Sequence, residues 1–110
     1  MFVITVGQGQ EVLATVAQEC KNRGVTDAAI VSLIGAVEGA TISVMAKDDA
    51  EVDLGYTYPE PLEIAGTGEI FDGQVHVHVV AGGERGTYAG HLHSATVNTF
   101  FVRVYVEPLA

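Results

Sequence analysis

Residues 73–95, GQVHVHVVAGGERGTYAGHLHSA, contain two runs of alternating apolar and polar residues on either side of a glycine-rich segment. A period of two is typical of strands with one buried face, and the three glycines among residues 82–86 mark a turn. The stretch therefore predicts a β-hairpin made of strands 74–81 and 87–95. Because strand-like segments also fill most of the chain around it, this hairpin indicates a fold built mainly of antiparallel sheet.

The predicted hairpin carries every histidine of the chain: His76, His78, His91 and His93. Alternate residues of a strand project to the same side, so each H-x-H pair shares a face. If the hairpin closes around GGERGT, His78 lies opposite His91, and His76 lies opposite His93. Directly opposed residues have Cβ atoms roughly 4.5–5.5 Å apart, so all four rings would meet on one face. A slip of one residue in the register would separate the two pairs.

Clustered imidazoles raise the question of a metal. Neutral imidazole is a good ligand for zinc and similar divalent ions, and three histidines plus water form a common open site. From spacing alone, a metal site and an ordinary solvated sheet face both remain open. Glu63 and Glu69, in the preceding strand, could accept a hydrogen bond from a ligand or act as a general base; they could equally be surface carboxylates.

One helix is expected, over Gln10 to Arg23, after a first strand at Phe2–Val6. The helical period places Cys20 on the same face as the apolar residues, which favours a packing role for this thiol. Gly24 is a natural C-terminal stop.

The remaining segments predict further strands at residues 28–34, 40–46, 62–70 and 97–106, with Gly35 ending the first of them. Residues 47–61 are acidic and contain two prolines, so we expect an exposed loop there. This loop lacks the spaced D-x-[DN]-x-[DN]-G pattern of a calcium site, which favours a solvated loop over a calcium-binding one.

These elements predict an α+β fold: a single domain over residues 1–110, with a mainly antiparallel β-sheet packed with one principal α-helix. The last predicted strand is apolar on both faces, and one small core rarely covers both faces of a strand, so a subunit interface is expected there. Its faces carry Phe100, Val102, Val104 and Val106 on one side and Phe101 and Tyr105 on the other.

Charge and composition exclude several classes of function. The formal net charge is −9 and the five Lys and Arg residues are scattered, which argues against direct nucleic-acid contact. No apolar run is long enough to span a membrane, and the start of the chain lacks a secretory signal pattern, so a cytoplasmic location is expected. One cysteine fits a reducing compartment. No nucleophile elbow or phosphate-binding loop is present, so the catalytic residues stay unknown.

Three stretches read together, PLEIAGTGEI (61–70), DGQVHVHVV (72–80) and YAGHLHSATV (88–97), resemble the plant-and-prokaryote-conserved (PPC) domain family. SLIGAVEGATI (32–42) is similar to a front-half pattern of that family, so the resemblance covers nearly the whole chain. The matching positions are Glu63, Gly68, Asp72-Gly73, His76, His78 and Gly90-His91-Leu92.

The resemblance implies a homotrimer and, for stand-alone prokaryotic members, a bound metal. It implies that His76, His78 and His91 hold the ion. Because imidazole ligands suit zinc, we expect a divalent ion, zinc, with water or a small anionic ligand at the open position. His93 lies outside the family pattern. The family often carries an acidic residue in its last strand, where this chain has Phe100-Phe101, so no role that needs that carboxylate is carried over.

A second function stays open beside metal binding. In plants the domain follows AT-hook motifs that contact DNA, and the domain itself mediates association. This chain has no R-G-R-P core and no basic tail, so that DNA contact does not transfer. The alternative is a non-catalytic protein-interaction or oligomerisation module linked to transcriptional regulation, with a protein partner and no direct DNA contact.

Overall fold

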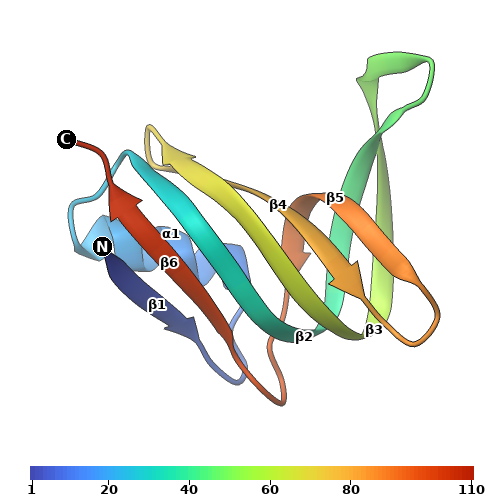
Figure 1. The fold of residues 1–110 in the computed structure, drawn as a ribbon, viewed down its shortest axis with the longest axis horizontal. Helices are drawn as coiled ribbons and strands as arrows, with labels where there is room; N and C mark the ends of the chain where they lie inside the picture. The colour runs from blue at the N-terminus through green and yellow to red at the C-terminus, as the bar shows by residue number, and fades with distance from the viewer.

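The structure, a computed structural model, describes all residues 1–110. In chain order the elements are β1 (Phe2–Val6), α1 (Val12–Asn22), β2 (Ala28–Ala46), β3 (Asp49–Phe71), β4 (Gln74–Gly82), β5 (Thr87–Ala95) and β6 (Val102–Pro108). The strands pair antiparallel in the order β1-β6-β2-β3-β4-β5, and an additional β2–β5 pairing joins strands β2 to β5 into a closed ring (Figure 1). The predicted α+β class, with one helix on an antiparallel sheet, is confirmed.

The core lies inside the curved sheet, between its concave face and α1 (Figure 1). Strands contribute every second residue to it, as Val77 and Val79 of β4 and Leu92 of β5 show. The helix contributes Val12, Val16 and Cys20, so the predicted packing role of the thiol is confirmed. Burial of this apolar surface is the main stabilising contribution to the fold, at about 25 cal/mol per Å² removed from water.

Helix α1 is confirmed, with its start two residues later than predicted. Glu11 is the N-cap, and its carboxylate accepts hydrogen bonds from the N–H groups of Leu13 (3.1 Å) and Ala14 (2.8 Å). The same carboxylate accepts the N–H of Ala95 at 2.9 Å, which ties the helix to the end of β5. Gly24 follows the C-cap with φ +70°, the left-handed conformation that ends many helices.

Strands 28–34 and 40–46 are one continuous strand, so the prediction that Gly35 ends the first is wrong. Strand β2 absorbs its irregularities as register shifts, including one between Ile30 and Leu33 and one between Glu38 and Ala40. A Cβ on Gly35 would overlap the backbone of Phe101. The glycine therefore serves a close approach of two chain segments rather than a strand end.

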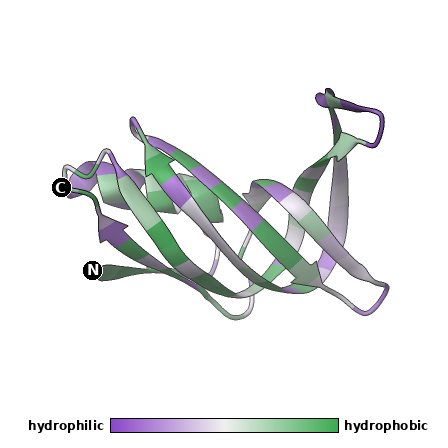
Figure 2. Cartoon of the chain, turned by 45° about the horizontal axis from the view of Figure 1, so that its top comes forward, coloured by the Kyte–Doolittle hydropathy of each residue, from purple (hydrophilic) through white to green (hydrophobic).

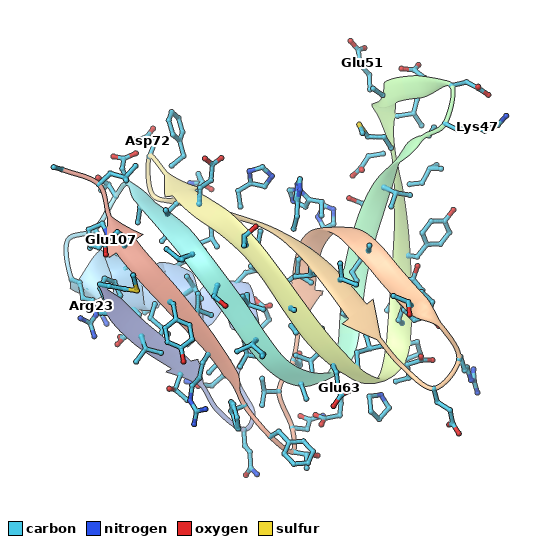
Figure 3. All side chains as sticks on the ribbon, in the orientation of Figure 1. Arg23, Lys47, Glu51, Glu63, Asp72 and Glu107 are labelled. Carbon is cyan, nitrogen blue, oxygen red and sulfur yellow. The ribbon has the colours of Figure 1, made fainter.

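The prediction of a loop over residues 47–61 is also wrong, because β3 begins at Asp49. Beyond Ser43 the two long strands form a two-stranded extension, which we call the arm (residues 44–54), projecting away from the rest of the molecule (Figure 1). Its tip is hydrophilic (Figure 2), and Lys47 and Glu51 lie there (Figure 3). An arm exposed on both faces lacks the one-sided burial that produces a strand pattern in sequence.

The last strand is shorter than predicted. β6 starts at Val102, so residues 97–101 precede it, and Phe100 is 64% exposed rather than aligned with Val104 and Val106. Val102, Val104 and Val106 are buried, as the alternation predicted. No helix combines the length and the apolar character needed to cross a membrane.

Candidate metal centre

The β4–β5 hairpin places three histidines on the outer face of the sheet. His78 lies directly opposite His91, which is the register predicted from the GGERGT turn. Val77 and Leu92, their neighbours in the chain, are buried in the core. Because side chains alternate along a strand, the histidines project away from the core and toward solvent.

His76, His78 and His91 form what we call the histidine cluster. One ring nitrogen from each lies within 4.8 Å of the others. The Nε2 atoms of His76 and His78 are 3.1 Å apart, and the His91 ring centroid lies 5.0 Å from that of His76. The fold therefore brings together the same three residues that the family resemblance implied.

The donor set suits a tetrahedral divalent ion. Zinc binds imidazole nitrogen at about 2.0–2.1 Å, so two nitrogens of a tetrahedral site lie about 3.3 Å apart. The His76–His78 separation of 3.1 Å is close to that value. The third ring has to approach by a small side-chain rotation, which partly exposed histidines allow. Three protein ligands leave the fourth position open to solvent.

Glu69 orients one of the three rings. Its Oε2 lies 3.1 Å from Nδ1 of His76, the residue directly opposite it in the β3–β4 ladder. A carboxylate on Nδ1 fixes the tautomer in which Nε2 is free to bind a metal and raises its basicity. Glu63 lies opposite Gly82 at the far end of this ladder, and Figure 3 shows it at the edge of the sheet. Of the two carboxylates that the sequence left open, Glu69 is the one that contacts the cluster.

His93 does not lie opposite His76, and that prediction is wrong. The β4–β5 ladder ends at the His78–His91 pair, after which β5 pairs with β2. The His93 ring lies 4.6 Å from that of His91, and its Nε2 is 2.7 Å from Oγ of Ser43 and 3.7 Å from Oδ2 of Asp53. These contacts define the polar cluster (Ser43, Asp53 and His93) beside the histidine cluster.

Neither Ser43 nor Asp53 was predicted from the sequence as a neighbour of the histidines. Ser43 is 2% exposed and is the one buried polar side chain of the chain, while Asp53 belongs to the arm that was predicted as a loop. No local motif connects either residue to a histidine roughly forty or fifty positions away. Long-range pairings bring them there: β2 with β5 for Ser43, and β2 with β3 for Asp53.

The surroundings of His91 keep its ring neutral, which is the form that binds a metal. Burial lowers the pKa of His91 below its ordinary value of 6.5, and the neighbouring His93, His76 and His78 lower it further, while Asp53 opposes them. A lowered pKa means that the ring is neutral at pH 7. Only the neutral ring has a nitrogen lone pair for a metal.

Comparison with known families gives one match, which spans the whole chain. Residues 1–110 match the family described as the Plants and Prokaryotes Conserved (PCC) domain. The sequence matches no curated protein.

Several solved structures share the fold. A candidate DNA-binding protein from Bacteroides thetaiotaomicron is 26% identical, with a TM-score of 0.82 over 98% of this chain and 78% of its own. A metal-containing protein from Archaeoglobus fulgidus is 27% identical, with a TM-score of 0.76 over 99% of this chain and 81% of its own. A plant- and prokaryote-conserved (PPC) protein from Pyrococcus horikoshii is 23% identical, with a TM-score of 0.81 over 99% and 78%.

Proposed function

The chain belongs to the Plants and Prokaryotes Conserved domain family, and on that premise we propose that it is a metal-binding domain in which His76, His78 and His91 hold a divalent ion. The observation that carries the proposal is the convergence of three ring nitrogens, from two adjacent strands, within 4.8 Å. The Archaeoglobus relative, named as metal-containing, supports it.

Zinc is the ion we propose. It accepts a tetrahedral set of nitrogen ligands, and a neutral His₃ set with one open position is typical of it. A bound ion would supply Lewis acidity toward water or a small ligand at that position. The chain's own contributions are the orientation of His76 by Glu69 and the neutral state of His91. We assign no reaction to the site.

Paired variants test the ligand assignment. His91→Ala removes one of three ligands, and we expect zinc affinity to fall at least about 100-fold, beyond the effect of losing an outer-shell partner. His93→Gln removes the neighbouring imidazole, which is not a proposed ligand, and should change the affinity less than about tenfold. Competition with a chromophoric chelator measures both. Equal losses of zinc affinity in the two variants would contradict the assignment of His91, rather than His93, as a ligand.

We also propose that the domain assembles as a homotrimer in the cytoplasm and presents a surface to a protein partner. The outer face of the sheet carries exposed apolar side chains, among them Val31 (51% exposed), Ile34 (54%) and Val80 (54%). Exposed apolar residues gathered on one face favour an interface. This second function, an interaction module linked to transcription, is also supported by the Bacteroides relative named as a candidate DNA-binding protein.

A measurement of molecular mass in solution separates metal binding from trimer assembly. Light scattering should give the mass of three chains for the wild type. If His91→Ala loses zinc but keeps the trimer, ligand chemistry and assembly are independent. A monomeric wild type at micromolar concentration would contradict the trimer, and loss of the trimer in His91→Ala would assign the histidines to assembly.

A further inference from the structure

We propose that the polar cluster (Ser43, Asp53 and His93) is a subsite for the metal's open position, and that it selects an uncharged, hydroxyl-bearing ligand over an anion. The inference rests on the proposed metal site. It replaces the small anion expected from the sequence with a different ligand class.

The polar cluster adjoins the histidine cluster on the same face. The β2–β5 pairing places Ser43 directly opposite His91, and the His93 ring packs 4.6 Å from the His91 ring. Asp53 reaches this face from β3, where its Oδ2 lies 3.7 Å from Nε2 of His93. A molecule bound at the open position would therefore lie close to a hydroxyl, an imidazole and a carboxylate.

The charges around the site balance the charge of a divalent ion. The three ligands are neutral imidazoles, so the ion contributes a charge of +2. Glu69, bonded to His76, and Asp53, near His93, together contribute −2. No Lys or Arg forms a hydrogen bond or ion pair with any of the four histidines. An anion at the open position therefore gains little long-range attraction and is repelled by the Asp53 carboxylate beside His93.

The same groups suit a hydroxyl. The Asp53 carboxylate accepts hydrogen bonds only, so it pairs with a ligand O–H and leaves a ligand carboxylate unpaired. The His93 ring can donate or accept toward a ligand, and the buried Ser43 hydroxyl holds that ring through a contact of 2.7 Å. Charge-assisted bonds of the O–H···O⁻ type are stronger than neutral ones. A small diol that binds the ion through one oxygen and donates from the other fits this arrangement.

Two small probes of similar size test the selection. Cobalt-substituted protein, whose visible spectrum reports ligands at the ion, is titrated with ethane-1,2-diol and with glycolate. In Asp53→Asn, we expect the Kd for glycolate to tighten by up to about fivefold, because removing one charge from an exposed, solvent-screened position changes binding by at most ~1 kcal/mol. The Kd for the diol should weaken about threefold, because a charge-assisted acceptor is lost. Glu51→Gln, which removes the same charge at the arm tip, should change neither value.

Opposite shifts for the two probes are the signature of the subsite. If Asp53→Asn moves both values in the same direction or moves neither, the inference is wrong while the metal site stands. If the wild-type protein takes up no cobalt, the proposed metal site fails, and this inference fails with it. The cobalt content of each sample, measured before titration, tells the two failures apart.

Discussion

At the scale of single residues, His76 has contacts at both ring nitrogens. Its Nδ1 lies 3.1 Å from the Glu69 carboxylate, and its Nε2 lies 3.1 Å from Nε2 of His78. A ring held in this way presents its Nε2 lone pair in a fixed direction, which reduces the entropy lost when a metal binds. We therefore expect Glu69 to raise the metal affinity of the site as well as to orient the His76 ring.

Replacing Glu69 tests this contribution. In Glu69→Gln the amide still fills the space, but the negative charge on Nδ1 of His76 is lost, so we expect zinc affinity to fall about 10-fold to 100-fold. Glu63→Gln removes an equal charge from the same strand, away from the cluster, and should leave the affinity unchanged. Chelator competition at fixed pH measures both. An effect of Glu63→Gln as large as that of Glu69→Gln would indicate a general charge effect instead.

The lowered pKa of His91 predicts how the metal-free protein responds to acid. Above the ordinary value of 6.5 the ring is neutral in the folded and unfolded chains, so it has no effect on the pH dependence. As the pH falls through 6.5, the unfolded chain binds the proton first, and the folded state loses stability relative to it. The urea midpoint should therefore fall more between about pH 8 and about pH 5 in the wild type than in His91→Gln. Equal changes in the two proteins would contradict this prediction.

Residue types and their spacing were enough to predict the histidine cluster but not its surroundings. The alternation and the short turn set the His78–His91 register. Both are local features, so this register could be predicted from the sequence. The partner of His93 depends on where β5 leaves β4 for β2, and no local pattern encodes that change. Ser43 and Asp53 were missed for the same reason.

At the scale of elements, glycines in β3 let β4 come close. A Cβ on Gly68 would overlap the carbonyl oxygen of His76, and a Cβ on Gly66 would overlap that of His78. These two positions lie beside the histidines in the β3–β4 ladder. The glycines therefore set the position of the backbone that carries two of the proposed ligands.

An alanine at Gly68 should disturb both stability and metal binding. The added methyl group forces β4 away at His76, and overpacking of this kind costs about 1–3 kcal/mol. Gly55→Ala, in the same strand but with open space around its Cβ position, is the matched control. Urea unfolding and zinc competition report the two effects. Wild-type values for both in Gly68→Ala would show that the backbone can shift freely there.

Elements with one buried face were predictable, and those without one were not. The strands of the hairpin alternate between buried and exposed residues, so their sequence shows the period. The arm is exposed on both faces, and its acidic residues were therefore attributed to a loop. Gly35 was interpreted as a strand end, because sequence does not distinguish a glycine that ends a strand from one that allows a close approach.

At the scale of the whole molecule, the charge distribution bears on the partner. The chain has 14 acidic and 5 basic residues, and its acidic arm tip extends into solvent (Figures 2 and 3). The Bacteroides relative, named as a candidate DNA-binding protein, does not bear out the expected absence of nucleic-acid contact, which stays a prediction. Affinity for DNA comes largely from Lys and Arg that neutralise phosphates, and this chain has few of them.

A binding titration tests that prediction. Fluorescence anisotropy with a labelled DNA duplex should show no binding by the metal-loaded protein up to about 100 μM at physiological salt, weaker than ordinary non-specific binding. Binding that weakens steeply as salt rises would contradict it.

The proposed function depends on a metal bound by three histidines. The most direct test is elemental analysis of protein purified without a histidine tag, loaded with zinc and then freed of excess metal. We predict one zinc per chain in the wild type, because three imidazoles from one chain complete the protein's share of an open site. Less than about 0.2 equivalents of any transition metal after loading would contradict the account.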